Sequence, residues 1–462
     1  MSILLVESHY RSRPWLKALG MTQLDKIHII SVNKGELRFF KELLPDTKIE
    51  ITKLWGHEHL NETLVTISKN LEEFSKKYSI DFSWIVQTDR TLRKKKRSLQ
   101  LSYLHRITVL LEKVFLTNPP NLVFMECTWA HEFITAQLAS TLGIPVLCPG
   151  PLRFINNRIL FFKGLSRKDY YLRDTGQSQT QAPPLTVRPF EQKPEEYDLL
   201  SKRNAFTFSK VRTLIRLCRD WAAGYRNPFI QPSISSEIYR KIKSLFRFYF
   251  IKLSTVLRGS GMPTGNYVLL GLHVQPEASI DVVGYRFRDQ IRFAEMIAEC
   301  LPINFTLVVK EHPHAIGSRP FGFYKRLLNI KNIRVVTFAN SSENLLQRAS
   351  LVITVAGTMS LEAACLGVKA VTAEEMFFSK ALPLPSLPDS LLDLKLRIAQ
   401  LLELHVDKQE YEKKINVMIA ELMPHTYPGK TSAPNQDPYA MGSENIAHLR
   451  YAFSEVIDKI HE

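Results

Sequence analysis

The chain alternates short apolar segments with amphipathic ones, and this alternation restricts its fold more than any other feature. The clearest example spans residues 118–149. Residues 122–125 are apolar enough for a buried strand, residues 130–142 have helical spacing, and Gly143 can end that helix before a second strand at 144–147. A strand, a helix and another strand in this order predict a parallel sheet covered by helices.

Two series of such segments divide the chain. We expect strands at residues 3–6, 27–32, 49–54, 84–86, 122–125 and 145–147 in the first series, and at 267–272, 305–310, 333–338, 351–355 and 368–372 in the second. The expected domains are a Rossmann-like domain at 1–173, a linker with a basic amphipathic helical segment at 174–260, a second Rossmann-like domain at 261–430, and a C-terminal loop and return helix at 431–462. This is an α/β fold in which two Rossmann-like domains face a ligand cleft.

The net charge of +16 is concentrated in two segments of the 462-residue chain. Residues 201–260 hold thirteen Lys or Arg against two acidic residues, and residues 89–97 hold six against one. The rest of the chain is neutral overall, so we expect local contacts with anions. Apolar residues at helical spacing in 238–256 fit either a helix on an anionic membrane surface or a helix packed between the domains. The chain lacks nucleic-acid-binding motifs, so nucleic acid is not an expected partner.

Composition narrows the class of protein further. Hydrophobic residues make up 45% of the chain, which excludes a mainly disordered protein. The five cysteines are scattered without metal-ligand spacing, which favours a reducing compartment over a disulfide scaffold or a zinc site. Residues 1–6 suit a first strand better than a signal peptide, and no apolar run is long enough to span a membrane. We expect a cytoplasmic protein that is soluble or peripherally bound to a membrane.

The first polar cluster of the second domain follows the strand expected at 267–272. His273, Gln275 and Glu277 lie at or just after its end. A carboxylate in this position can act as a nucleophile, as a base or as a stabiliser of positive charge. The alternative is a loop that only caps the next helix.

The second and third clusters follow the strands expected at 305–310 and 351–355. The second contains Lys310, His312 and Pro313, where proline fixes the loop and imidazole can donate to a phosphate oxygen. Structural use and a metal site with His314 are the alternatives. The third cluster comprises Gly357, Thr358, Ser360 and Glu362. A glycine before a helix start can admit an anion, and Glu362 can bind ribose hydroxyls, whereas helix capping is the structural alternative.

The first domain carries its polar cluster after the strand expected at 122–125. Glu126, His131 and Glu132 are candidates for acceptor binding or general-base chemistry, with helix capping as the alternative. Arg153 and Arg158 follow the next strand, where they can face an anionic sugar or solvent.

The three blocks of the second domain, in this order, resemble bacterial capsule polysaccharide biosynthesis proteins, a family that includes the β-Kdo glycosyltransferases. The resemblance is clearest at residues 265–375 and weaker at 118–165. It implies a GT-B-like glycosyltransferase with an N-terminal acceptor domain and a C-terminal nucleotide-sugar domain. The donor would be a nucleotide sugar, with CMP-Kdo as one candidate, and the acceptor a glycan or lipid-linked glycan at the inner membrane.

The resemblance also implies roles for particular residues. The family's His-Pro pair, which contacts the donor nucleotide, falls on His312 and Pro313. Its phosphate-binding turn falls on Gly357, Thr358 and Ser360.

The reacting groups follow from the same resemblance. The family's reactive carboxylate falls on Glu277, where Kdo enzymes carry Asp, and it would stabilise or attack the oxocarbenium-like centre. Glu126 or His131 would orient or deprotonate the acceptor hydroxyl. No DxD motif is convincing, so we expect neither a metal nor any cofactor besides the nucleotide-sugar substrate.

Two other functions fit parts of the same pattern. A sugar-nucleotide 2-epimerase shares the paired Rossmann-like domains, but it would turn over its substrate without an acceptor. A non-enzymatic nucleotide-binding or membrane-binding adaptor of the polysaccharide machinery would explain the ten aromatic residues in the basic segment 201–260. The polar clusters after the strands favour the transferase over both.

Overall fold

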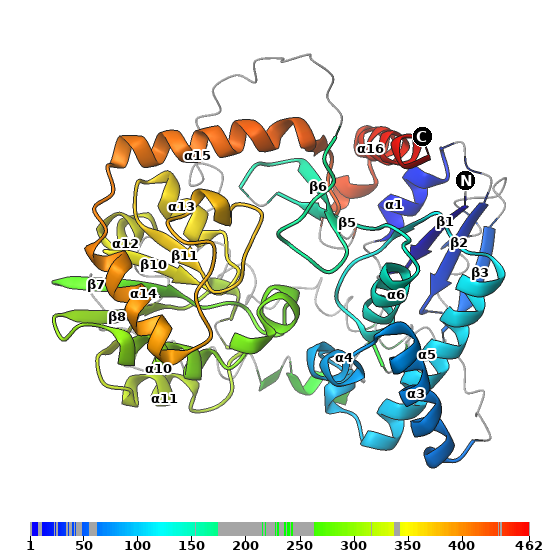
Figure 1. Ribbon diagram of the computed structural model, residues 1–462, viewed down its shortest axis with the longest axis horizontal. Coiled ribbons are helices and arrows are strands. Elements are labelled where there is room, and N and C mark those ends of the chain that lie inside the picture. Colours follow the sequence, from blue (N-terminus) through cyan, green and yellow to red (C-terminus); the bar gives the residue numbers. More distant parts are fainter. Residues whose placement is uncertain are drawn as a thin grey trace. The chain divides into compact units, whose positions relative to one another are not determined.

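The computed structural model divides into two compact units (Figure 1). Unit 1 comprises Met1–Gly176, Phe208–Ile234 and His425–Glu462, and unit 2 comprises Gln177–Thr207 and Ser235–Pro424. The structure describes residues 2–7, 12–22, 24, 26–33, 36, 39–40, 42, 49–54, 62–152, 154–173, 215, 218, 227, 229–230, 235–236, 238–240, 242–243, 263–315, 317–336, 342–432, 434 and 437–461.

The sheet of unit 1 has the strand order β12-β6-β5-β4-β1-β2-β3. The strands from β3 to β5 run parallel, while β6 pairs antiparallel with β5 and β12 pairs antiparallel with β6. The strands are β1 (Ser2–Val6), β2 (Lys26–Ser31), β3 (Ile49–Lys53), β4 (Leu122–Phe124), β5 (Val146–Pro151), β6 (Arg158–Lys163) and β12 (Tyr427–Pro428). β1, β2 and β4 are short and mostly buried, as expected for strands covered by helices on both faces, whereas the edge strand β3 is only partly buried.

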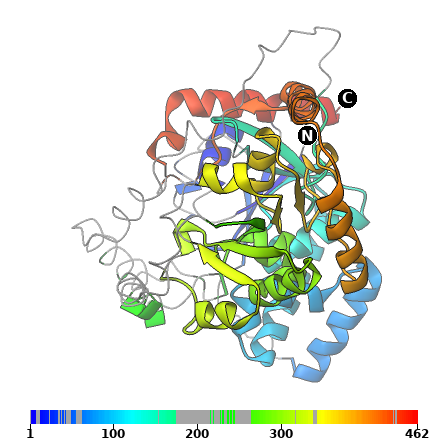
Figure 2. The same cartoon turned by 90° about the vertical axis from the view of Figure 1, so that its left-hand side faces the viewer.

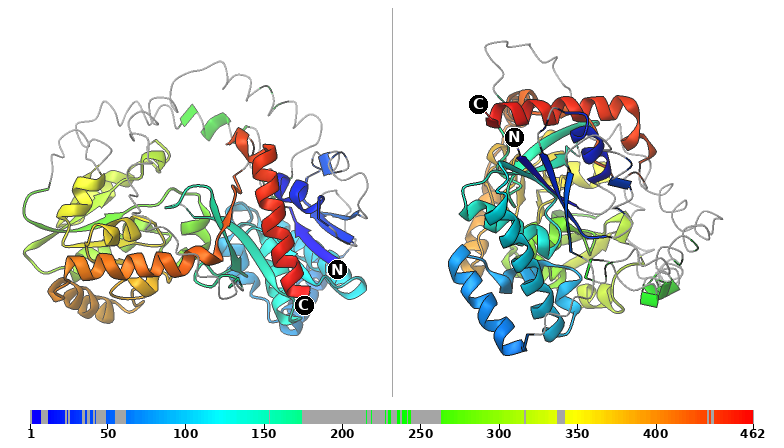
Figure 3. Two further views of the ribbon diagram at one scale, coloured as in Figure 1. Left: turned by 90° about the horizontal axis from the view of Figure 1, so that it is seen from above. Right: turned by 90° about the vertical axis from the view of Figure 1, so that its right-hand side faces the viewer.

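The C-terminal helix of the chain packs on the sheet of unit 1. This helix, α16 (Ser443–His461), contacts α1 (Ser12–Leu19), as the right panel of Figure 3 shows beside the blue strands. Phe453 of α16 lies edge-on to Phe124 of β4 and to Phe161 of β6, with ring centroids 4.7 and 5.3 Å apart. These rings are completely buried, so the end of the chain completes the core of its first unit.

Four further helices in the described part of unit 1 pack against one another. α3 (Leu64–Tyr78) contacts α5 (Arg97–Thr117), and α6 (Ala130–Thr141) contacts α4 (Phe82–Thr88) and α5. Short 3₁₀ turns lie at η2 (Leu92–Lys94), η8 (Met423–His425) and η9 (Pro438–Met441).

One expected strand of unit 1 is wrong. Residues 84–86 form part of α4, which begins after Asp81, whose Oδ1 accepts the amide hydrogen of Trp84 at 2.9 Å. A run of three apolar residues fits a helix face as well as a strand, and the capping aspartate decides between them here.

The sheet of unit 2 has the order β11-β10-β7-β8-β9, and every pair in it is parallel. The strands are β7 (Asn266–Gly271), β8 (Phe305–Lys310), β9 (Ile333–Val336), β10 (Leu351–Thr354) and β11 (Ala370–Thr372). Numbered along the chain, this is the 3-2-1-4-5 order of a Rossmann-like sheet.

Helices lie between these strands and after the last of them, and Figure 2 shows the sheet of unit 2 among them. They are α10 (Gln290–Cys300), α11 (Phe323–Asn329), α12 (Ser342–Arg348), α13 (Met359–Cys365), α14 (Leu391–Glu403) and α15 (Lys408–Leu422). Short turns lie at η4 (Ser279–Val283), η5 (Tyr285–Phe287), η6 (Pro313–Ala315) and η7 (Ser379–Ala381). Residues of β7, β8, β10, α10 and α14 form the main apolar core of the unit.

The expected fold class, α/β with two Rossmann-like sheets, is confirmed. Most of the basic segment 174–260, including much of the helix expected at 238–256, lies outside the described residues. Within the described part of the chain, no helix combines the length and the apolar composition needed to cross a bilayer.

Candidate functional site

The predicted residues of unit 2 follow three neighbouring strands. Gly271 at the end of β7 lies opposite Thr354 of β10 on one side and Lys310 of β8 on the other. The strand order reverses between β7 and β10, and open parallel sheets bind ligands beyond the strand ends at such a reversal. We call the three loops that begin here the strand-end site; they comprise residues 272–278, 311–315 and 355–358.

The loop after β7 is fixed by the side chain of Gln290, the first residue of α10. Gln290 Oε1 accepts the His273 amide hydrogen at 2.7 Å, and its Nε2 donates to His273 O at 3.2 Å and to Gln275 Oε1 at 3.1 Å. The Gln275 amide in turn donates to Asp281 Oδ1 at 3.2 Å and to Arg288 O at 3.1 Å. The side chain of Gln275 is therefore bonded to the η4 turn, to Arg288 and to the start of α10.

His273 joins the first and third loops of the strand-end site. Its Nε2 accepts the amide hydrogen of Ala356 at 3.3 Å. A Cβ atom on Gly357 would lie 3.2 Å from His273 Cε1, so a larger residue there would press on the imidazole. Since Nε2 is an acceptor, the neutral ring carries its proton on Nδ1.

Glu277 lies where the loop after β7 enters the η4 turn. Its carbonyl accepts the amide hydrogens of Ile280 and Asp281, at 3.3 and 2.8 Å. Its carboxylate is half-buried, and Oε2 accepts the Ser279 hydroxyl at 3.1 Å. A half-buried carboxylate can be reached from solvent, as a reacting group requires.

The loop after β8 contains a buried ion pair that sequence reasoning did not single out. Arg319 binds both carboxylate oxygens of Glu311, at 2.8 and 2.7 Å, and Tyr324 donates to the same carboxylate at 2.9 Å. Glu311 is completely buried and Arg319 is 4% exposed. Burial opposes the charged form of Arg319, but Glu311 and Tyr324 keep its pKa above the ordinary value.

The same ion pair connects two loops of the strand-end site. Arg319 Nη2 donates to His273 O at 2.8 Å, in the loop after β7. Glu311 Oε1 accepts the amide hydrogen of His312 at 2.7 Å, in the loop after β8. The positions of His273 and His312 therefore depend on one buried guanidinium–carboxylate pair.

His312 is half-buried beside the η6 turn that begins at Pro313. Its Nδ1 accepts the amide hydrogen of His314 at 3.1 Å, so the neutral ring carries its proton on Nε2. The Nε2 atom is then a hydrogen-bond donor, which suits a phosphate oxygen. Lys310, the last residue of β8, is buried.

The third loop combines reachable and buried predicted residues. The Ser360 hydroxyl lies 2.7 Å from Thr354 Oγ1 and donates to Val371 O at 3.1 Å, and Thr358 Oγ1 donates to Glu362 Oε1 at 3.2 Å. Ser360 and Glu362 are buried, whereas Gly357 and Thr358 are half-buried. A ligand can therefore reach Gly357 and Thr358 more readily, and nucleotide contact with all four residues stays a prediction.

Unit 1 has a similar strand reversal between β1 and β4. Glu126 is half-buried after β4, and His131 is completely buried in the first turn of α6. Glu7, which sequence reasoning did not select, follows β1 and is also completely buried. His131 Nε2 lies 3.3 Å from Glu7 O. The structure thus brings His131 to the ends of both central strands.

The carboxyl group of Glu7 is completely buried, and burial changes its pKa. Oε2 accepts the Ser31 hydroxyl at 2.6 Å and the Val32 amide hydrogen at 2.9 Å. Burial, and next the charge of Glu36, raise the Glu7 pKa well above the ordinary range. Within the described part of the chain, Glu7 Oε1 and His131 Nδ1 have no hydrogen-bond partner. Burial likewise lowers the His131 pKa to about 4.

The other predicted residues of unit 1 are Glu132, Arg158 and Arg153. Glu132 Oε2 accepts the amide hydrogens of Thr128 and Trp129 at 2.6 and 3.0 Å, so this carboxylate caps α6. Arg158 donates to Thr426 Oγ1 at 2.8 Å, and Arg153 lies outside the described residues. Among the residues that the structure describes, no three His, Cys, Asp or Glu side chains gather as a metal site would require.

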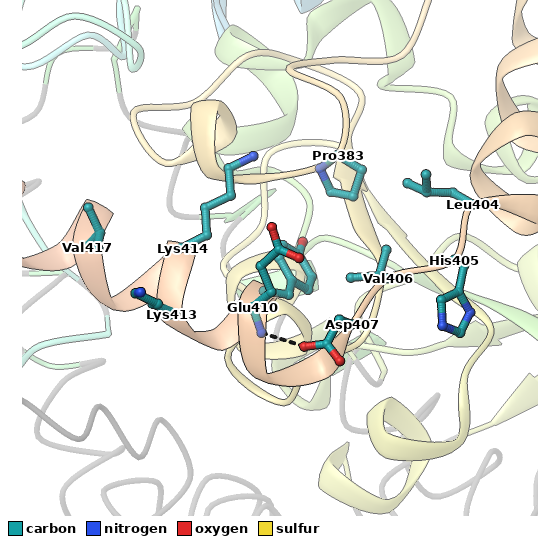
Figure 4. A pocket seen from close by; sticks show the side chains of 10 residues that line it. Pro383, Leu404, His405, Val406, Asp407, Glu410, Lys413, Lys414 and Val417 are labelled. Atoms are coloured by element: carbon teal, nitrogen blue, oxygen red, sulfur yellow. Dashed lines mark hydrogen bonds between the residues drawn. The ribbon is translucent and has the colours of Figure 1, made fainter.

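A hollow of about 560 Å³ lies elsewhere in unit 2, along the start of α15 (Figure 4). Leu404, His405, Glu410 and Lys414 contribute to its lining, and Asp407 caps the helix by accepting the Glu410 amide hydrogen at 2.8 Å. None of the predicted site residues lines this hollow. It is therefore separate from the strand-end site.

Comparison with known proteins gives similar solved structures only. No family model and no curated protein matches the chain. KpsC of Thermosulfurimonas dismutans, a β-Kdo 2,7 transferase, is 11% identical over 94% of this chain and 98% of its own, with a TM-score of 0.37. The UDP-GlcNAc 2-epimerase of Methanocaldococcus jannaschii is 16% identical over 90% of this chain and 99% of its own, with a TM-score of 0.27.

A third similar structure is the spinosyn rhamnosyltransferase SpnG, 13% identical over 92% of this chain and 99% of its own, with a TM-score of 0.26. Because all three TM-scores lie below 0.5, function has to be inferred from the side chains of the site itself.

Replacing Arg319 by Met should destabilise unit 2 by about 3–5 kcal/mol, because it leaves the Glu311 carboxylate buried without its cation. Urea unfolding measures the loss. The double variant Glu311→Gln/Arg319→Met should be less destabilised than Arg319→Met alone. Arg292→Met removes a salt bridge of the same 2.7 Å length at an exposed position and should cost no more than about 1 kcal/mol. Equal losses for the two single Arg variants would contradict the role of burial.

His131 should make the stability of unit 1 depend on pH. Its folded-state pKa of about 4 lies below the ordinary 6.5, so the unfolded chain binds the proton more strongly. Stability should therefore fall as the pH drops from 6.5 toward 4, by about 3 kcal/mol in full. Between pH 7.5 and 5, wild type should lose about 2 kcal/mol more than His131→Gln in urea unfolding. Exposed His405→Gln serves as the control and should lose as much as wild type.

Proposed function

We propose that this protein is a glycosyltransferase that moves a sugar from a nucleotide-sugar donor to a glycan or glycolipid acceptor in the synthesis of a bacterial capsule or surface polysaccharide. CMP-Kdo is the candidate donor that the motif resemblance favours. The proposal is carried by two groups on loops that follow the adjacent strands β7 and β8, namely the half-buried carboxylate of Glu277 and the Nε2–H donor of His312. That arrangement suits the two charges that develop when a sugar leaves a phosphate.

The donor nucleotide would bind at the loops after β8 and β10. His312 Nε2 would donate to a phosphate oxygen, and the Thr358 hydroxyl beside Gly357 would supply a second polar contact. Lys310 and the loop at Pro313 would keep His312 in position. As the bond between the anomeric carbon and the phosphate oxygen breaks, its electron pair stays on the phosphate, and these groups stabilise the added negative charge.

Glu277 would act at the anomeric carbon from the loop after β7. As the sugar becomes oxocarbenium-like, a nearby carboxylate stabilises it by charge or by forming a transient bond. Transfer is complete when the acceptor oxygen bonds to the anomeric carbon. His273 would hold the loops after β7 and β10 together during these steps through its bond to Ala356.

The acceptor hydroxyl must also lose its proton, and His131 and Glu126 are the predicted candidates for the base. His131 is completely buried, and a pKa near 4 makes its imidazole a weak base at neutral pH. Glu126 is half-buried two residues after β4, where a substrate can reach it. We therefore assign the proton to Glu126 and a positioning role to His131.

Replacing His312 by Ala should weaken nucleotide binding about 10- to 150-fold, the value of one hydrogen bond to a charged group, about 1.5–3 kcal/mol. Calorimetry with CMP, UDP and GDP measures the dissociation constants. His314→Ala is the matched control, because its backbone still donates to position 312. If wild type binds none of the three nucleotides, the proposed function is wrong.

Replacing Glu277 by Gln should lower the rate of transfer at least about 100-fold while the Kd for the nucleotide stays within about twofold. Transfer is followed as glycoside formed from donor and acceptor, with exposed Glu299→Gln on α10 as control. Full activity of Glu277→Gln would remove Glu277 from the mechanism. Change of the donor sugar without any acceptor would instead identify a 2-epimerase.

A further inference from the structure

The outer side of α5 in unit 1 carries apolar and cationic side chains together. Residues at steps of three and four along the helix form one stripe, which we call the α5 face; it comprises Leu99, Ser102, Arg106, Val109, Lys113 and Leu116. Its three aliphatic side chains are 47%, 45% and 62% exposed. α5 lies beside α3 in Figure 1, and the inward side of the helix is buried.

The only acidic residue of α5 does not weaken the charge of this face. Glu112 accepts Lys77 Nζ and the Tyr78 hydroxyl, each at 2.8 Å. The negative charge of Glu112 is thus paired with groups of α3. The α5 face itself has two cations and no acid.

A cationic turn continues the α5 face at its N-terminal end. Residues 90–97 hold six Lys or Arg, and the neighbouring acid, Asp89, is buried. Asp89 accepts the amide hydrogens of Thr91, Leu92 and Ala130, which occupies its carboxylate. Within the described residues, Lys96 and Arg97 are exposed and form no ion pair.

This arrangement does not serve the stability of α5. The N-terminus of a helix is its positive end, where acidic residues stabilise and cations destabilise. α5 begins instead with Lys96 at its N-cap, without a capping side chain, and has no acid in its first turn. An external anionic surface would compensate these charges.

We propose that the α5 face and the turn at residues 90–97 bind the surface of an anionic phospholipid bilayer. The cations of this surface favour an anionic partner. The exposed leucines favour a partner that also offers an apolar region, as a lipid bilayer does. Leu99 and Leu116 can enter the boundary between head groups and acyl chains, while Arg106 and Lys113 reach lipid phosphates with their long stems. A nucleic acid or an acidic glycan would use the cations but not the aliphatic side chains.

The strand-end site belongs to unit 2, whereas this surface belongs to unit 1 and contacts the basic segment 174–260, where Thr91 donates to Ile230 O at 3.4 Å and Lys95 lies over the Phe229 ring. Its binding can be measured without turnover, so its failure would leave the proposed reaction untouched. The probe is the full chain with vesicles of phosphatidylcholine alone, or with 30 mol% phosphatidylglycerol as an experimental choice, at roughly physiological ionic strength of 0.15 M. Flotation gives the fraction bound at each lipid concentration.

The charge-reversed variant Lys96→Glu/Arg97→Glu/Lys113→Glu should bind anionic vesicles at least about 100-fold more weakly, from roughly fivefold for each cation near such a surface. Lys325→Glu/Arg326→Glu/Lys331→Glu changes the net charge equally on exposed positions of unit 2 and should bind like wild type. Acid residues at positions 96 and 97 favour the N-terminus of α5, so the fold is kept. Equal loss in both triple variants would overturn the proposal.

The apolar part of the surface is tested by Leu99→Gln/Leu116→Gln, which keeps every charge. Binding to anionic vesicles should fall at least about fivefold, because two half-exposed leucines no longer leave water. Circular dichroism checks that α5 remains folded. Unchanged vesicle binding by this variant would overturn the bilayer as the partner and point to a soluble polyanion. Wild-type binding to phosphatidylcholine alone as tightly as to anionic vesicles would also overturn it.

Discussion

The carboxylate of Glu311 has no solvent around it, and a charge in that position costs several kcal/mol unless a cation and hydrogen bonds replace the water. Arg319 provides the cation in bidentate geometry, and Tyr324 adds a third bond. The same two charged groups hold the backbone of His273 and of His312. The geometry of the strand-end site therefore depends on the Glu311–Arg319 ion pair, although neither residue is itself a predicted ligand-binding residue.

Unit 1 treats its buried ionisable groups differently. Burial is the largest influence on the pKa values of Glu7 and His131, and it shifts both toward the neutral forms. Two hydrogen bonds satisfy one oxygen of Glu7, and one contact satisfies His131 Nε2. Glu311 is thus stabilised by a paired cation, whereas burial favours the neutral forms of Glu7 and His131.

Much of the fold could be predicted from local patterns, because buried parallel strands are short apolar runs and the helices between them have their own period. The apolar run at 84–86 failed, since three residues cannot distinguish the two periods and Asp81 caps a helix there. In the site, the polar residues directly after the strands could be predicted, because a residue that follows a predicted strand lies at the edge of the sheet. Gln290 and Arg319 were missed. Each binds the backbone of His273 from a position much later in the chain, and no local sequence pattern indicates such a contact.

The sequence by itself determined the α/β class, the two series of strands and the polar residues at their ends, because these depend on periodicity and on residues next to each other in the chain. It also located the positive charge. Only the tertiary structure decided which of those residues are reachable: Glu277 and His312 are half-buried, while Ser360, Glu362 and His131 are buried. Likewise, only the packed α5 reveals that its leucines and cations share one outer face. Burial and hydrogen bonding arise between distant segments, so no local pattern contains them.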